Sequence, residues 1–131
     1  HAATLEIKPF GRPGDPAKVS RSVQIRMSDE KRFEPPALRV RRGETIRLVV
    51  TNAGEEMHEI VLGAAEHLRA HAELMKKDPD AEHDETWGVH VLPGHRETLV
   101  WQFTLPGEVW YACLVPGHYE AGMVGKIVVK P

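Results

Sequence analysis

The sequence predicts an all-β protein, a Greek-key β-sandwich with one inserted α-helix. Short runs of alternating apolar and polar residues, bounded by Gly, Pro, Asn or Asp, recur along most of the chain. Such runs are typical of the strands of a sandwich. One stretch in the middle is built instead from Ala, Glu, Leu, Met and Lys, which favour helix. The 131 residues have the size of one domain, and no internal repeat is evident.

The beginning of the chain differs from the rest. Residues 1–16 are rich in Pro and Gly and weakly patterned, so we expect an N-terminal arm with a short edge strand at Thr4–Ile7. Residues 17–131 are expected to form a single domain. Its first strand is Val19–Met27, where apolar residues alternate, and Phe33–Pro36 is expected to break the pattern.

Three further strands are expected before the helix. The strongest has Ile46, Leu48 and Val50 on one face, which is the alternation of a half-buried strand. A turn at Asn52–Gly54 follows it. The three strands are Leu38–Val40, Thr45–Thr51 and His58–Leu62.

A helix is predicted at Ala64–Lys77, because its residues favour helix and Leu68, Ala72 and Met75 share one side. Asp78–Asp80 ends it. The helix and the His-rich loop after it form an insertion at about 64–95. Four strands are then expected, at Gly88–Leu92, Glu97–Phe103, Glu108–Cys113 and Val124–Val129.

Composition excludes several classes of function. The formal net charge is −2, so there is no basic field for nucleic acid. No apolar run approaches the ~20 residues that a membrane span needs. There is no G-x-S-x-G motif, P-loop or paired-Cys zinc signature, so we do not expect an enzyme.

One short segment carries distinctive chemistry. Cys113, His118 and Met123 form a C-x4-H-x4-M run. A lone Cys is either a small buried hydrophobe or a metal-bound thiolate, and the His and Met at these spacings favour the metal. Thiolate and thioether favour Cu(I), whereas imidazole also accepts Cu(II). Electron-transfer copper sites have two His, so one is missing, and His58 is our candidate.

This run resembles the C-terminal ligand loop of the cupredoxins, the type 1 copper family. Thr51–Leu62 is similar to the stretch around the family's first His, and the resemblance covers roughly residues 37–129. It implies the cupredoxin fold and one copper that cycles between Cu(I) and Cu(II). It further implies an equatorial trigon and a weak axial Met, supplied by His58, Cys113, His118 and Met123.

Two features depart from the family pattern. Many members carry Asn directly after the first His, bonded to the Cys loop, but here Glu59 stands in that place. Asn52 could serve instead, or the role is absent. The loop, with four residues on each side of His118, is also longer than in plastocyanin-like members, which favours a shorter axial bond and a greener colour.

Two functions stay open. One is an electron carrier whose partner is a c-type cytochrome or an oxidase. The other is a copper-handling protein or chaperone that passes copper to exporting machinery, since the inserted helix resembles periplasmic cupredoxins linked to copper tolerance. A structural module with a vestigial site is disfavoured, because all the expected ligand types are present.

The copper-handling function would include an auxiliary copper site in the insertion. His67 and His71 lie four residues apart on the predicted helix, so their rings can share a metal. Met75 continues that face and His83 follows it. A simpler interpretation is that these His and Met residues are ordinary surface side chains. The resemblance also implies export to the periplasm after removal of a signal peptide, and we expect a monomer without a membrane span.

Overall fold

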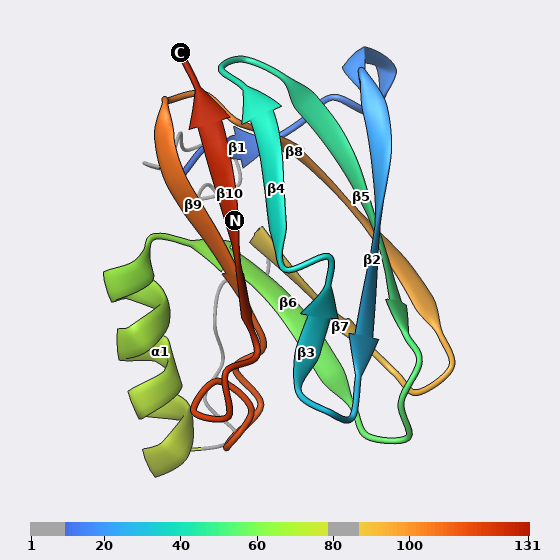
Figure 1. Cartoon of the computed structure of the whole chain (residues 1–131), viewed down its shortest axis with the longest axis vertical. Coiled ribbons are helices and arrows are strands. Elements are labelled where there is room, and N and C mark those ends of the chain that lie inside the picture. Colours follow the sequence, from blue (N-terminus) through green and yellow to red (C-terminus); the bar gives the residue numbers. More distant parts are fainter. Residues whose placement is uncertain (1–9, 79–86) are drawn as a thin grey trace.

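The structure is a computed structural model that describes residues 10–78 and 87–131, and it consists of two facing β-sheets with one α-helix at the side (Figure 1). The first sheet has the strand order β1-β8-β5-β2-β3 and the second has the order β4-β10-β9-β6-β7. This arrangement confirms the predicted all-β Greek-key sandwich with one inserted helix. The strands of the first sheet are β1 (Arg12–Pro13), β2 (Arg21–Ser28), β3 (Arg32–Glu34), β5 (Thr45–Asn52) and β8 (Arg96–Gln102). Those of the second sheet are β4 (Ala37–Arg41), β6 (His58–Gly63), β7 (Gly88–Val91), β9 (Gly107–Ala112) and β10 (Val124–Lys130).

The core lies between the sheets and follows from the alternation in the sequence. Ile46, Leu48 and Val50 of β5 are all fully buried, as the sequence predicts. Strand β6 differs, because all six of its residues are buried. The helix α1 (Ala65–Lys77) contacts β6 and β9 and covers part of this sheet. It matches the predicted helix to within one residue.

The helix packs through the face that the sequence predicts. Leu68, Ala72 and Met75 are its buried residues. Leu68 lies against Gly63 at the end of β6, where any larger side chain would be crowded. Among the helices that the structure describes, none is long and apolar enough to cross a membrane.

Two strands were not expected. β1 lies within the predicted arm and pairs with the edge of β8. β3 includes Phe33 and Glu34, where a break was predicted, because β2 and β3 form an antiparallel hairpin. The turn of this hairpin has Lys31 with φ of 61°, a conformation that usually calls for Gly, so the sequence lacks the Gly that would have indicated this turn. The predicted strand at Thr4–Ile7 lies outside the described residues.

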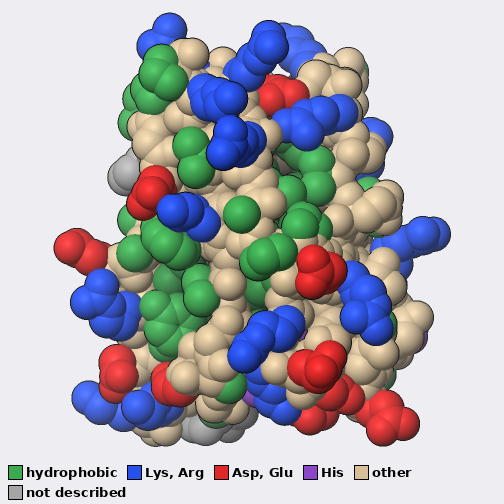
Figure 2. All heavy atoms as spheres, viewed as in Figure 1, with side chains coloured by type: hydrophobic (Ala, Val, Ile, Leu, Met, Phe, Trp, Pro, Cys, Tyr) green, Lys and Arg blue, Asp and Glu red, His purple; other side chains and the backbone are tan. Residues whose placement is uncertain are grey.

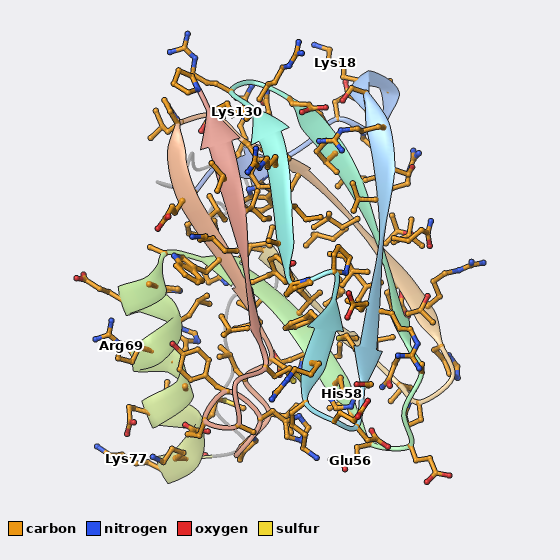
Figure 3. The ribbon with its side chains drawn as sticks, viewed as in Figure 1. Lys18, Glu56, His58, Arg69, Lys77 and Lys130 are labelled. Atoms are coloured by element: carbon orange, nitrogen blue, oxygen red, sulfur yellow. The ribbon has the colours of Figure 1, made fainter. Side chains whose placement is uncertain are left out.

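One pairing matters most for the site. β2 and β5 run parallel, with Met27 opposite Asn52. Parallel neighbours end at the same edge of a sheet, so the turn after β2 lies beside the loop after β5. This edge is the end of the sandwich where Figure 3 labels Glu56 and His58, far from Lys130 near the C-terminus.

Candidate metal centre

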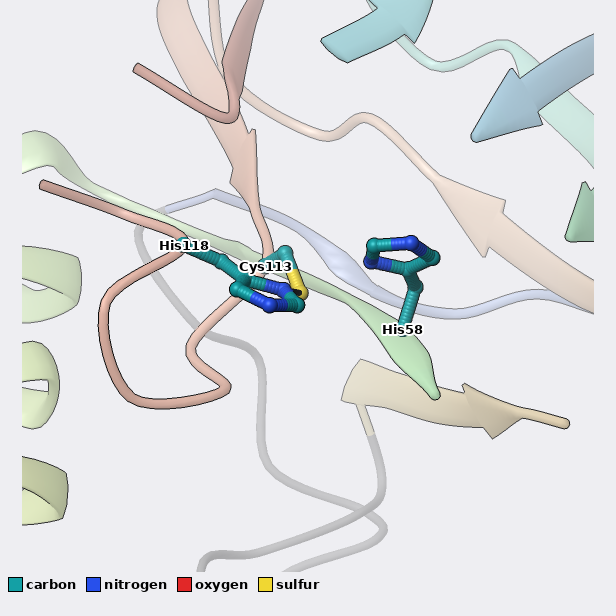
Figure 4. Close-up of side chains that lie close together, drawn as sticks. All are labelled: His58, Cys113 and His118. Atoms are coloured by element: carbon teal, nitrogen blue, oxygen red, sulfur yellow. Dashed lines mark hydrogen bonds between the residues drawn. The ribbon is translucent and has the colours of Figure 1, made fainter. Parts of the chain in front are cut away.

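Three metal-binding side chains meet at this end of the sandwich. One ligand atom from each of His58, Cys113 and His118 lies within 4.8 Å of the other two. Figure 4 shows His58 at the start of β6 and the other two side chains on the segment that follows β9. His58 and Cys113 are fully buried and His118 is 5% exposed. The structure therefore brings together three residues that lie up to 60 positions apart, as sequence reasoning expected.

Backbone hydrogen bonds close the loop that carries Cys113 and His118. The N–H of Cys113 donates to the carbonyl of Met123 over 3.1 Å, and the N–H of Met123 donates to the carbonyl of His118, also over 3.1 Å. The loop thus returns on itself, and Met123, which is fully buried, is held beside the other two residues. All four predicted site residues consequently belong to one compact region.

A tight turn presents His118. Its N–H donates to the carbonyl of Val115 over 2.9 Å, with Pro116 and Gly117 between them. Pro fixes its own φ, and Gly117 has φ of 89°, which is the combination of a type II turn. The Pro116–Gly117 pair therefore sets the direction from which the imidazole enters the site.

A carboxylate supports His58 from the outside. Oδ1 of Asp29, in the turn after β2, lies 3.0 Å from Nε2 of His58. The same carboxylate accepts the backbone N–H groups of Glu55 at 2.7 Å and Glu56 at 3.2 Å. The bond from the Glu55 backbone, followed by the contact with His58, lowers the pKa of Asp29 to about 2. Asp29 is thus a fixed anion beside Nε2 of His58, and sequence reasoning missed it.

A second carboxylate supports His118. Oε1 of Glu56 lies 3.2 Å from Nε2 of this histidine. Nζ of Lys31 lies 3.3 and 3.1 Å from the two Glu56 oxygens, and this bond is the main cause of a lowered pKa at Glu56. Acidic side chains also gather at the lower right of Figure 2, the end where Figure 3 labels Glu56. Their negative potential favours cations at this end.

In the metal-free protein, burial favours the neutral forms of the Cys113 thiol and the His118 imidazole. Burial raises the pKa of Cys113 to about 12, although backbone N–H groups of Glu59 and Val115 oppose this. Burial and the nearby His58 lower the pKa of His118. Sγ of Cys113 lies 3.4 Å from Nδ1 of His118. A bound metal would take the place of the thiol proton.

One buried atom of the cluster fits the role of a metal ligand. Nδ1 of His58 is buried and has no hydrogen-bond partner among the described residues. An orphaned buried nitrogen is costly, whereas a metal ligand needs that lone pair. Together with a second imidazole, a thiolate and a nearby thioether, the donor set fits copper that cycles between two oxidation states.

The structure also answers the question raised by Glu59. The side chain of Asn52 donates to the carbonyls of Glu56 and Val91, both over 2.8 Å, and accepts the N–H of Gly54. It therefore holds its own loop against β7 rather than the Cys loop. The thiol receives its hydrogen bond from the backbone N–H of Glu59 instead, over 3.4 Å.

The residues of the possible auxiliary site are only partly assembled. The rings of His67 and His71 lie 4.7 Å apart between centroids, as expected for neighbours on one helix face. Met75 is buried on the packed side of the helix. His83 lies outside the described ranges. The idea of an auxiliary metal site stays a prediction.

Fold and site together define a cupredoxin, and the comparisons with known proteins agree. A family model described as copper binding proteins of the plastocyanin/azurin family matches residues 19–130. The chain therefore belongs to the plastocyanin/azurin family of copper-binding proteins, which confirms the predicted resemblance and copper as the metal. Solved structures with the same fold include two auracyanins. An auracyanin B has a TM-score of 0.74 and 21% identity over 92% of this chain and 96% of that one. A dithionite-reduced auracyanin from Roseiflexus castenholzii has a TM-score of 0.74 and 23% identity over 86% and 99%.

More similar sequences are found among characterised relatives. The chain is 52% identical to the copper-resistant cuproprotein CopI of Rubrivivax gelatinosus, over 93% of this chain and 74% of the relative. It is 33% identical to the copper-resistant cuproprotein CopI of Pseudomonas aeruginosa, over 93% of this chain and 83% of the relative.

Proposed function

We propose that the chain binds one type 1 copper and cycles it between Cu(I) and Cu(II) in periplasmic copper tolerance. The imidazoles of His58 and His118, the thiolate of Cys113 and, more weakly, the thioether of Met123 would hold the copper. The observation that carries the proposal is the cluster of three buried donor atoms within 4.8 Å of one another. When bound, copper would supply reversible one-electron chemistry between Cu(I) and Cu(II).

The protein's own contribution is a site that needs little rearrangement. The donors are buried and the loop from Cys113 to Met123 is closed by backbone hydrogen bonds. Copper held by all four residues would change oxidation state with little movement of its ligands, and it would have no open position for a substrate, unlike the metal of a hydrolytic site. We accordingly propose a redox copper protein rather than an enzyme.

Substitution of the ligands tests the copper site. Wild type loaded with Cu(II) should show an intense visible band and a type 1 EPR signal, and both should be lost in Cys113→Ser and in His58→Ala. The exposed His95 gives the matched control, because His95→Ala should leave both signals in place. A wild-type protein without the visible band, or a coloured Cys113→Ser, would contradict the assignment.

The biological role is supported by the named relatives, which are described as copper-resistant cuproproteins. We expect deletion of the gene to make the organism sensitive to copper, wild type to restore growth and Cys113→Ser to fail. Fractionation should find the protein in the periplasm. Normal growth of the deletion strain in copper, combined with slow respiration, would favour an electron carrier that donates to a cytochrome or an oxidase.

A second candidate function is copper handling through an auxiliary site. The adjacent rings of His67 and His71 support it. It predicts more than one copper per wild-type chain and a lower ratio in the double variant His67→Ala/His71→Ala. An unchanged ratio of one copper per chain would argue for the type 1 site alone.

A further inference from the structure

Both histidines of the metal centre have a carboxylate on their outer nitrogen. We infer that Asp29 and Glu56 are positioning residues that fix the orientation of His58 and His118 and favour Cu(II) over Cu(I). The inference rests on the proposed copper site. It concerns residues that no sequence motif identifies, since they lie in the turn after β2 and in the loop after β5.

The first step is the choice of tautomer. An imidazole has two nitrogens, and a neutral ring carries a proton on only one of them. Nε2 of His58 lies 3.0 Å from Asp29, and Nε2 of His118 lies 3.2 Å from Glu56. A carboxylate in each place holds the proton on Nε2, which leaves both Nδ1 lone pairs for the metal. The orphaned Nδ1 of His58 and the contact of Nδ1 of His118 with the thiol agree with this orientation.

The second step is how firmly Asp29 is held. It receives two backbone N–H groups besides the imidazole, so its orientation does not depend on a flexible partner. Gly54 makes room for it, because a Cβ at this position would collide with the Asp29 carboxylate. Asn52 holds the same loop through its amide. The absence of a side chain at residue 54 is thus a condition for the contact between Asp29 and His58.

The third step concerns Glu56, which is held less firmly. Its side chain is 49% exposed and its charge is shared with Lys31. Lys31 occupies a left-handed backbone conformation that favours Gly, yet a lysine stands there and its ammonium contacts Glu56. A residue kept in an unfavourable conformation is a reason to look for a role. Here the role is to hold Glu56 over the second histidine.

The fourth step links these contacts to the oxidation state. A carboxylate behind a ligating imidazole makes the ring a stronger donor and places negative charge near the metal. The doubly charged ion gains more from both effects than the singly charged one. Removing the carboxylate should therefore weaken Cu(II) binding more than Cu(I) binding, which raises the reduction potential.

The experiment compares neutral isosteres with matched controls in the copper-loaded protein. For Asp29→Asn we expect Cu(II) affinity to fall at least tenfold, as for other losses of such partners. A tenfold loss confined to Cu(II) corresponds to a potential about 59 mV higher. Glu56→Gln should shift the potential in the same direction but less, and its shift should shrink more at high salt, because the Glu56 side chain is 49% exposed and that of Asp29 is 33% exposed. The neighbours Glu30 and Glu55 are exposed, so Glu30→Gln and Glu55→Gln remove the same charge from the same loops as controls.

Gly54→Ala provides an independent test, because it displaces the Asp29 carboxylate without changing any charge. It should raise the potential as Asp29→Asn does. Equal potentials in wild type, Asp29→Asn and Gly54→Ala, with the visible band present in all three, would overturn the inference and leave the copper site intact. Shifts in Glu30→Gln as large as in Asp29→Asn would also overturn it, since they would show a general charge effect. Absence of the visible band in wild type would instead contradict the proposed copper site itself.

Discussion

The backbone N–H of Glu59 donates to Sγ of Cys113 over 3.4 Å, from the second residue of β6 to the residue that follows β9. The hydrogen bond comes from the main chain, so the pairing of two strands provides it and no particular side chain is needed. The side chain of Glu59 is directed elsewhere, since its Oε1 lies 3.5 Å from Nε2 of His90. This hydrogen bond to the sulfur should therefore persist when the side chain at position 59 is changed.

The first prediction follows from this relationship. Glu59→Gln keeps the backbone N–H and a side chain of the same shape. We expect the copper-loaded variant to keep the visible band at the wild-type wavelength, because that band reports the bond between copper and the thiolate. Absorption spectroscopy checks it, with Cys113→Ser as the reference for a lost band. A displaced band would show that the carboxylate itself acts on the sulfur.

The second prediction concerns the axial position. Met123→Leu replaces a thioether by an apolar side chain of similar volume, so the unfolding free energy should fall by less than about 1.5 kcal/mol. Loss of the proposed axial donor should raise the reduction potential while copper stays bound, because the axial ligand tunes the potential of such sites. Voltammetry measures this. The exposed Met57 supplies the control, and a Met57→Leu variant should have the wild-type potential.

The third prediction concerns the core between the sheets. Leu48 is fully buried on β5, whereas Leu105 is 53% exposed. Leu48→Ala should lower the unfolding free energy by about 2–5 kcal/mol, because it leaves a cavity. Leu105→Ala should change it by less than about 0.5 kcal/mol. Chemical denaturation of the copper-free protein measures both values, and a similar effect of the two substitutions would contradict the assignment of the core.

The fourth prediction concerns acid stability at the end away from the metal centre. Burial would raise the pKa of Glu44, but hydrogen bonds from Ser20, the Arg41 backbone and Arg21 outweigh it and hold the pKa below its ordinary value of 4.5. The folded state therefore binds fewer protons than the unfolded chain in this range. The resulting stabilisation is present above pH 4.5 and is lost as the pH falls below it.

Chemical denaturation of the copper-free protein at several pH values tests this. The unfolding free energy of Glu44→Gln should depend less on pH below 4.5 than that of wild type. Glu97 is exposed on β8, and Glu97→Gln serves as the control with the wild-type slope. An identical slope in all three proteins would mean that the bonds to Glu44 do not persist in solution.

The sequence was sufficient for the parts of the molecule that depend on local pattern. The alternation of β5 and the apolar face of the helix are local signals, and both are present in the structure. The spacing of Cys113, His118 and Met123 is local as well, because one short loop carries all three. His58 was chosen because the loop lacks a second His, and the family resemblance supported the choice; its own position alone is typical of a surface residue.

The outer contacts of the site could not be predicted in the same way. The bond between Asp29 and His58 exists because β2 and β5 are parallel neighbours, and no local pattern specifies which strands are adjacent. The hairpin of β2 and β3 was missed because Lys31 takes a conformation in which Gly is expected. Both omissions concern the turn between β2 and β3, which carries Asp29, the residue whose carboxylate contacts His58.

Residue 131 lies next to Lys130, at the end of the sandwich opposite His58 (Figures 1 and 3). If the protein were attached to a surface through residue 131, the end of the sandwich with the metal centre would face the solution. Immobilised on an electrode in this way, the protein would present the end that carries Glu56 and the metal centre to soluble partners, whereas a linker in the loop after β5 would bring that end against the surface.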